Sequence, residues 1–265
     1  MSDFLSSMAA SSRLRAERVK ARIGMRGLRS RADSAHPTKS LVLDPSGFDL
    51  IAETKLASPS RGRIAGPSDD VNQVVVLAEG MARSGAAAIS VLTEPDSFDG
   101  SIEHLEAVAS RVDVPVMRKD FLVDPIQILE ARANGASGVL LIARITGESK
   151  LIEMTDLALE LGMFVLVEIF EEGEVDVASS VFDRMVLVGV NARDLSTLKV
   201  DRSRHAELFS KLPSHLPAVA ESGITTADHA AECSRLGYRL ALVGSSLVDG
   251  GSAKDLTREM IEAGR

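Results

Sequence analysis

From residue 48 onward, short apolar runs alternate with longer segments in which apolar residues recur every three or four positions. Short runs rich in Val, Ile and Leu predict strands that are buried on both faces, and the longer period predicts helices. The predicted strands span 49–53, 86–92, 114–119, 138–143, 163–168, 185–191, 217–222 and 240–245. Clear helical segments lie between them, for example at 69–85, 124–135, 148–162 and 226–237.

The ends of these helical segments carry helix-capping residues. Gly85, Gly135, Gly162 and Gly237 stand where the apolar pattern stops, and glycine readily adopts the left-handed conformation that ends a helix. Thr226 begins the last of the four segments and is a typical N-cap residue. The chain therefore reads as a regular succession of strands and helices.

Eight strands that alternate with helices indicate an α/β fold with a parallel sheet and crossover helices. Eight is also the number that closes into a (β/α)8 TIM barrel. The rival is an open, doubly wound sheet, which would carry a Gly-rich dinucleotide turn after its first strand; here residues 55–62 read KLASPSRG. No linker rich in Pro or Ser divides 48–265, so we expect one barrel domain there and a helical N-terminal extension over 1–47.

Charge is distributed unevenly along the chain. The net charge is −8, yet residues 13–31 hold eight Arg or Lys and one Glu, so they carry +7 and the remaining residues carry −15. An acidic body makes nucleic acid an unsuitable general partner. We interpret the basic segment as a helix that packs on this body, with an organellar transit peptide as the alternative.

The cysteine and histidine content gives no support to a metal site. Cys233 is the only cysteine, so the chain has no internal disulfide, which suits a cytoplasmic location. The five histidines are scattered and none pairs at a metal-ligand spacing. No apolar run approaches the roughly 18 residues of a membrane helix, so no membrane association is expected.

Charged and amide residues gather where the predicted strands end. Active sites of α/β barrels form at the C-terminal ends of the strands, and alternation lets such residues point inward. Inward charges are costly unless they are paired or functional. Two interpretations stay open: a catalytic set, or lysines and glutamates that neutralise one another. The residues concerned are Glu53, Lys55, Lys119, Glu168, Asn191 and Glu221.

Three further strand-end charges, Glu94, Arg118 and Asp194, are each interpreted as solvated loop charges. Two loops after the last two strands suggest an anion site instead. They read ESGIT (221–225) and VGSSL (243–247), and small residues at a helix start present backbone N–H groups to a phosphate. A hydroxyl of Ser58 or Ser60 is a further candidate contact, whereas simple turn glycines are the alternative for Gly223 and Gly244.

Together these motifs resemble the indole-3-glycerol phosphate synthase family of tryptophan biosynthesis. The matching segments run in order over residues 50–247 and include IAETKLASPSRG, VPVMRKDFLVDP, VGVNARDLSTLKVD, VAESGITT and LVGSSL. Phosphate-binding barrels share the last two segments, but the SPS, RKDF and N-x-RDL motifs as a set are specific. The resemblance implies a TIM barrel whose N-terminal extension covers the barrel mouth.

The resemblance also implies residue roles. Lys119 corresponds to a general acid, Glu168 to an acid/base group for dehydration, and Glu53 and Lys55 to members of the catalytic set. The implied contacts to the substrate's hydroxyls and carboxylate are Asn191, Arg193, Glu221 and Ser222; those to its phosphate are Ser58, Gly223, Gly244 and Ser245; and those to its aromatic ring are Phe98, Phe121, Leu195 and Leu198.

The implied activity is ring closure, decarboxylation and dehydration of 1-(2-carboxyphenylamino)-1-deoxyribulose 5-phosphate. It implies a phosphorylated small molecule as substrate, no cofactor or metal, and other tryptophan-pathway enzymes as candidate partners. The chain departs from the family at Leu56, where a basic residue is usual, at Ala192, where asparagine is common, and in its first 47 residues, which match poorly. The rivals are a specialised paralogue acting on a modified anthranilate ring, a sugar-phosphate isomerase of the same pathway, and a non-catalytic phosphate-binding barrel.

Overall fold

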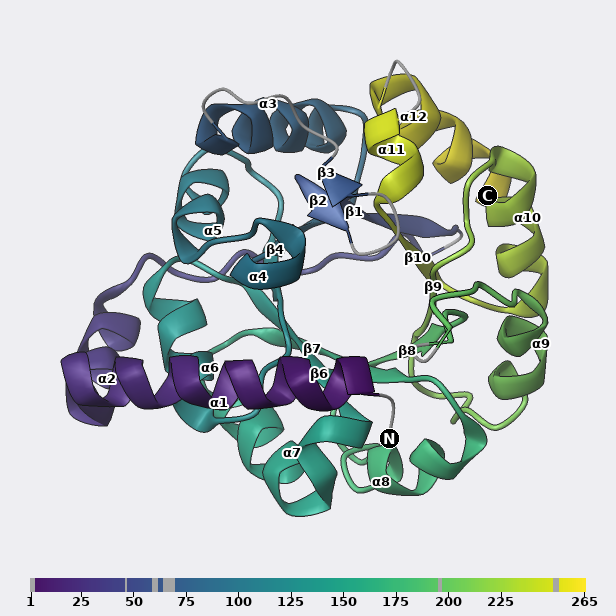
Figure 1. The fold of residues 1–265 in the computed structure, drawn as a ribbon. Helices are drawn as coiled ribbons and strands as arrows, with labels where there is room; N and C mark the ends of the chain where they lie inside the picture. The colour runs from purple at the N-terminus through teal and green to yellow at the C-terminus, as the bar shows by residue number, and fades with distance from the viewer. Residues whose placement is uncertain (1–2, 46, 59–61, 64–69, 195–196, 250–252) are drawn as a thin grey trace.

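The computed structural model describes residues 3–45, 47–58, 62–63, 70–194, 197–249 and 253–265. Across these ranges, eight parallel strands close into a barrel in the order β1-β10-β9-β8-β7-β6-β5-β4 (Figure 1). They are β1 (Asp49–Thr54), β4 (Ala88–Leu92), β5 (Val116–Lys119), β6 (Gly138–Ile142), β7 (Phe164–Ile169), β8 (Leu187–Asn191), β9 (Ala218–Glu221) and β10 (Leu240–Val243). The predicted TIM barrel is confirmed, and the open doubly wound sheet is not formed.

Helices surround the barrel, as Figure 1 shows. The larger ones are α3 (Asp70–Arg83), α5 (Ile102–Ala109), α6 (Pro125–Ala133), α7 (Ala143–Glu160), α10 (Ala227–Leu236) and α12 (Ala253–Gly264). Shorter elements are α4 (Pro95–Phe98), η1 (Glu172–Glu174), α8 (Val175–Ser179), α9 (Ser203–Phe209), α11 (Ser245–Asp249) and the hairpin of β2 (Ala57–Ser58) and β3 (Gly62–Arg63). The predicted caps are confirmed, because all four helix-end glycines have positive φ and Thr226 Oγ1 accepts the N–H of His229.

Several strands begin one or two residues later than predicted. Pro115 and Pro217 lie just before β5 and β9 and accept hydrogen bonds from Ile89 and Val188 through their carbonyls. Proline has no N–H to donate, so a ladder cannot extend through it on both sides. Ser222 was predicted within a strand but leaves β9 with a φ of 65°, and Ser245 opens α11 instead of ending β10.

Side-chain alternation divides the strand residues into two layers. One buried cluster fills the barrel interior, and a larger one lies between the strands and the surrounding helices. On four strands, a charged side chain points into the barrel two residues after an apolar side chain that also points inward. This holds for Ile51 and Glu53 on β1, Met117 and Lys119 on β5, Leu166 and Glu168 on β7, and Val219 and Glu221 on β9. The barrel interior is therefore apolar below and charged at its C-terminal end.

Two helices precede the barrel, α1 (Asp3–Arg22) and α2 (Gly24–Ser34). Figure 1 shows α1 passing in front of α6 and β6, with its N-terminal end over the lower part of the barrel. Ion pairs of 2.7 Å fix both helices to the acidic body: Arg15–Asp120, Lys20–Asp124 and Arg29–Glu160. This confirms that the basic segment is helical and packs on that body, although it is divided between two helices that meet at Ile23. In the described ranges, no helix is both long and apolar enough to cross a membrane.

Candidate active site

A cavity of about 380 Å³ opens at the C-terminal end of the barrel. All six strand-end residues proposed from the sequence contribute to its wall: Glu53, Lys55, Lys119, Glu168, Asn191 and Glu221. Eight of the expected contact residues line it as well: Phe98, Phe121, Arg193, Leu198, Ser222, Gly223, Gly244 and Ser245. Residues from five different strands and the loops after them thus meet in one space.

Two lysines lie among the carboxylates of this cavity. Lys55 Nζ is 3.0 Å from Glu53 Oε1, and Lys119 Nζ is 3.8 Å from Glu168 Oε2. Burial by itself would lower the pKa of Lys119, but Glu168 and the two other carboxylates nearby outweigh it and raise that pKa. Lys119 is therefore an ammonium at neutral pH, which is the form that can donate a proton.

The carboxylates of the cavity differ in their environments. Burial raises the pKa of Glu53, but Lys55 and Lys119 more than offset it, so this pKa is lowered and the side chain stays ionised. Glu221 is the opposite case, because burial and then the neighbouring Glu168 raise its pKa well above the ordinary value. Carboxyl groups whose pKa values are driven apart suit a site that needs both an acid and a base.

Hydrogen bonding distinguishes the two interpretations that the sequence left open. Within the described ranges, no N–H or hydroxyl group donates to either oxygen of Glu221 or to Oε2 of Glu168, all of which are buried, so a protonated Glu221 has Glu168 alone to bond to. A cluster built only for mutual neutralisation would satisfy these oxygens, since an unmade buried hydrogen bond is costly. The arrangement favours a functional site over a structural ion-pair cluster.

One side of the cavity is aromatic. The rings of Phe98 and Phe121 lie 6.3 Å apart between centroids, and Phe4 of α1 meets Phe121 edge-on at 6.1 Å. Leu198 also lines the cavity. This wall offers a flat apolar surface for an aromatic ring. Phe4 was missed by the sequence reasoning, because no pattern in the sequence links the first turn of α1 to a strand end more than 110 residues away.

The opposite side is formed by the loops after β9 and β10. Ser222 and Gly223 have successive positive φ angles of 65° and 81°. Such a conformation is uncommon for a residue other than glycine and is typical of functional turns. Gly244 and Ser245 complete this side where α11 begins. Small residues and exposed backbone N–H groups give it the character of an anion site.

Comparison with known proteins identifies the family. A sequence model of indole-3-glycerol phosphate synthase matches residues 5–260. The chain belongs to the indole-3-glycerol phosphate synthase family. The synthase of Mycobacterium ulcerans is 40% identical over 92% of this chain and 89% of its own length. That of a Parafrankia species is 42% identical over 84% and 81%, respectively.

Solved structures agree on the fold. The 3-hexulose-6-phosphate synthase of Salmonella typhimurium superposes with a TM-score of 0.65 over 82% of this chain and 98% of its own, at 12% identity. This likeness concerns the barrel alone. The indole-3-glycerol phosphate synthase match starts at residue 5, so it reaches into the first 47 residues, which the sequence motifs had left outside the resemblance.

Two glycines leave the space that the strand-end carboxylates Glu221 and Glu53 occupy. Gly189 of β8 pairs with Glu168 of β7, and a Cβ at Gly189 would overlap Glu221 Oε1. A Cβ at Gly244 would overlap Glu53 Oε1 and approach Lys55 Nζ to 3.0 Å. Gly189 was not among the candidate residues. A glycine inside a buried strand was the available signal, since it marks close approach of another group.

Glu94 and Arg118 contradict their interpretation as solvated loop charges. Arg118 is 3% exposed and its guanidinium bonds Glu130 Oε2 at 2.9 Å and Thr93 Oγ1 at 3.0 Å. Glu94 is fully buried and its carboxylate accepts two backbone N–H groups at the start of α4. In a closed barrel the outward face of a strand meets a helix instead of water, so both charges needed buried partners. Asp194 is half-buried.

Three of the expected residues lie wholly or partly outside the described structure. Leu195 and Ser60 are not among the described residues. Ser58 is described only through its backbone, which forms part of β2. All three stay predictions. Leu56, one of the departures from the family pattern, is 4% exposed and belongs to the apolar cluster between β-strands and helices.

Proposed function

We propose that the chain converts 1-(2-carboxyphenylamino)-1-deoxyribulose 5-phosphate to indole-3-glycerol phosphate, CO2 and water, the carboxy-lyase step of tryptophan synthesis. The observation that carries the proposal is the group of Lys119, Glu168 and Glu221 at the cavity, in which three buried carboxylate oxygens have no hydrogen-bond partner among the described residues. Membership of the synthase family supports it.

The two sides of the cavity match the two ends of this substrate. The aromatic ring lies against Phe98 and Phe121, with Leu195 and Leu198 as the proposed remainder of the wall. The phosphate lies at the loops of Gly223, Gly244 and Ser245, with Ser58 as a further proposed contact. The hydroxyls and the carboxylate are held between these two sides by Asn191, Arg193, Glu221 and Ser222. Holding a flexible substrate bent so that its reacting carbons meet lowers the entropic barrier of ring closure.

Lys119 is the proposed acid of the first step. The ring carbon that bears the carboxylate attacks the C2′ carbonyl carbon, a carbon–carbon bond forms, and negative charge develops on the ketone oxygen. The Lys119 ammonium donates a proton to this oxygen. Its raised pKa keeps it charged until then. Proton transfer of this kind contributes roughly 10²–10⁴-fold to the rate.

Loss of CO2 then breaks the bond to the carboxylate carbon and restores the aromatic ring. The new hydroxyl leaves as water when Glu168 protonates it with the proton that the Glu168–Glu221 pair holds, since burial and Glu168 raise the pKa of Glu221. The substrate's own nitrogen supplies the electron pair that expels the water. The Lys119 amine, neutral after the first step, takes a proton from the methylene carbon beside the nitrogen, which completes the indole and restores the ammonium. Lys55, Glu53 and Glu221 keep the charge of this group balanced as protons move. The substrate nitrogen acts as electron source, so the sequence of steps calls for no cofactor.

The proposal extends to the organisation of the chain. Residues 1–47 form an extension that closes the barrel mouth, and residues 48–265 form the catalytic barrel. A cytoplasmic location accompanies this role, with other tryptophan-pathway enzymes as candidate protein partners.

The direct test uses the absence of Trp from the chain. Purified protein is mixed with the carboxyphenylamino-deoxyribulose phosphate and new indole fluorescence is recorded, with Lys119→Ala in parallel. Signal from the wild type and almost none from the variant is expected. Substrate binding without signal from either protein would contradict the proposal and would favour a barrel that kept its phosphate site and changed its chemistry.

A further inference from the structure

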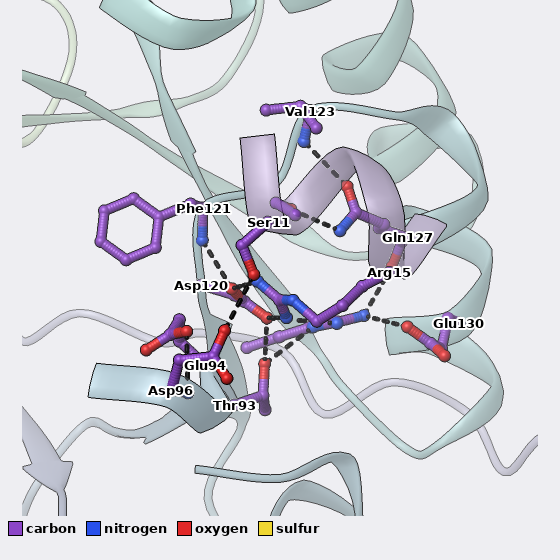
Figure 2. Close-up of polar contacts among 12 residues, drawn as sticks. Ser11, Arg15, Thr93, Glu94, Asp96, Asp120, Phe121, Val123, Gln127 and Glu130 are labelled. Atoms are coloured by element: carbon purple, nitrogen blue, oxygen red, sulfur yellow. Dashed lines mark hydrogen bonds and ion pairs between the residues drawn. The ribbon is translucent and has the colours of Figure 1, made fainter. Parts of the chain in front are cut away.

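Asp120 follows Lys119 directly and is the most completely bonded carboxylate near the cavity. Its side chain is fully buried. Figure 2 shows the Arg15 guanidinium reaching it, with Thr93 beside it. Oδ1 accepts from Arg15 Nη2 at 2.8 Å and from the N–H of Phe121 at 2.8 Å. Oδ2 accepts from Arg15 Nη1 and Thr93 Oγ1, each at 2.7 Å, and from Arg118 Nη2 at 3.3 Å.

These bonds give Asp120 a role different from that of its neighbour. Although burial raises the pKa of Asp120, the hydrogen bonds from Arg15 and the charges of Arg118 and Arg15 lower it to about 2. The carboxylate is ionised at any working pH and every lone pair direction is used. Asp120 lines the cavity but is unsuited to proton transfer.

The Arg15–Asp120 pair joins α1 to the end of β5. A bidentate guanidinium–carboxylate pair fixes both distance and orientation. Two hydrogen bonds extend the same contact: Ser11 Oγ donates to Asp96 at 2.9 Å, and Ser12 Oγ accepts from Gln127 Nε2 at 2.8 Å. Ser11 and Ser12 lie about one turn of α1 before Arg15. The partners of these three residues lie on α4, on α6 and directly after β5, and together they hold the helix in one direction.

The first turn of the same helix enters the cavity. Phe4 lies eleven residues before Arg15, about three helical turns or ~16 Å along α1. A rigid helix held at Arg15 therefore determines where the Phe4 ring meets Phe121. Phe121 is held from the other direction, because its N–H is bonded to the same Asp120 carboxylate. One carboxylate thus fixes both partners of the aromatic contact.

We propose that Arg15 and Asp120 are positioning residues, which seat α1 so that Phe4 and Phe121 form the wall for the aromatic end of the ligand. The inference rests on the proposed function for the identity of that ligand. Lys119 directly precedes Asp120, but loss of the Arg15–Asp120 pair should affect substrate binding more than proton transfer. The reason is that α1 contributes Phe4 to the cavity and no group that transfers protons.

The test compares Arg15→Met with Lys20→Met. Lys20 is the matched control because it also ties α1 to the body, through Asp124, on a side away from the cavity. We expect Arg15→Met to raise KM by about tenfold with a smaller change in kcat, as misplacement of a binding group does. Lys20→Met should keep the wild-type KM. Arg15→Lys, which retains charge but not the bidentate geometry, should recover part of the loss.

A second readout separates positioning from simple stabilisation. Phe4→Ala should raise KM on its own, and adding Arg15→Met should raise it little further, because both changes remove the same wall. Additive effects on KM, or an Arg15→Met variant whose only defect is a lower Tm, would overturn the inference.

Affinity for the substrate with its ketone reduced to an alcohol, which cannot undergo ring closure, is measured by calorimetry on all variants. Absence of turnover by the wild type would count against the proposed function. The calorimetric Kd values would still decide the inference: equal Kd for wild type and Arg15→Met overturns it, and a tenfold weaker Kd for that variant alone supports it.

Discussion

Neighbouring residues of β5 belong to two buried charge clusters that differ in one respect. Arg118 points outward toward α6 and α1, where Thr93, Asp120, Glu130 and Gln127 satisfy its guanidinium. Lys119 points inward, where the carboxylates around it keep oxygens without a hydrogen-bond partner among the described residues. We call Arg118 and its partners Thr93, Asp120, Gln127 and Glu130 the outer cluster, and Lys119 with Glu53, Glu168 and Glu221 the inner cluster. Most polar groups of the outer cluster are hydrogen-bonded, whereas the inner cluster keeps carboxylate oxygens without such a bond among the described residues.

The difference separates stability from function. A buried charge is tolerable when its partners complete its hydrogen bonds, and removing one partner then destabilises the fold. A buried charge with unmade bonds costs free energy in the empty protein and can recover it when a ligand arrives. Outer-cluster variants should therefore lose stability, whereas inner-cluster variants should lose turnover.

The largest effect is expected from the matched pair Glu168→Gln and Glu130→Gln. Glu168→Gln should lower kcat by roughly 10²–10³-fold, because it removes the proposed proton donor of the dehydration step. Its free energy of unfolding should change little. Glu130→Gln removes the charge that Arg118 faces and should lower unfolding free energy with a smaller change in kcat. Steady-state kinetics measure kcat and urea unfolding measures stability for both variants. A larger loss of kcat in Glu130→Gln, or a larger loss of stability in Glu168→Gln, would contradict the distinction between the two clusters.

Gly189→Ala tests whether space beside the carboxylates matters for the inner cluster. The added methyl would overlap Glu221 Oε1 and must displace that side chain. We expect kcat to fall by on the order of 10²-fold, which is the effect of small misplacements at a reacting centre. Gly173→Ala is the control, because a Cβ there meets nothing within 4 Å. Equal turnover in both variants would show that Glu221 need not be held in place.

Asp120→Asn tests the outer cluster through pH. The pKa of Asp120 is about 2 in the folded protein against an ordinary value of 3.8. Ionised Asp120 therefore stabilises the fold at pH values above its unfolded-state pKa, by about 2 kcal/mol, and this stabilisation is lost as pH falls from about 4 to about 2. Urea unfolding at successive pH values should give a flatter profile for Asp120→Asn over this window. Parallel profiles would mean that Asp120 is not held ionised.

Glu94→Ala should have the smallest effect. It removes the carboxylate that accepts the N–H groups of Asp96 and Ser97 at the start of α4. Loss of an N-cap costs about 1 kcal/mol. Turnover should be retained, although Glu94 directly follows a strand end. Glu103→Ala, an exposed residue on α5, serves as the control. A large loss of turnover would move Glu94 into the inner cluster.

The fold and the inner cluster were accessible from sequence because both follow from local patterns. Short apolar runs and capped helices predicted the barrel, and side-chain alternation at the C-terminal strand ends then predicted where Lys119, Glu168 and Glu221 meet. The outer cluster was not accessible. Arg118 was misjudged, because its partners come from α6 and from the strand beside β5, and tertiary packing alone brings them together.

Phe4 and Gly189 were missed for related reasons. Phe4 reaches the cavity only because the N-terminal end of α1 lies over the barrel, a position that the helix's own residues do not determine. Gly189 is important because it leaves room for the side chain of Glu221, which lies on β9, the next strand of the barrel. Residues whose role depends on contacts between distant parts of the chain are difficult to identify from a single sequence.

The most direct test of the account compares Lys119→Met with Arg118→Met, which are adjacent on β5 and differ in the face they occupy. Lys119→Met should lose at least about 10²-fold in kcat, and it should lose less stability than Arg118→Met, because its ion pair with Glu168 is long, at 3.8 Å. Arg118→Met should lose about 3–5 kcal/mol of stability, because Asp120 and Glu130 lose a buried partner, while its folded fraction keeps most of its turnover. Equal losses of turnover in the two variants, or a larger loss of stability in Lys119→Met, would contradict the division between the two clusters.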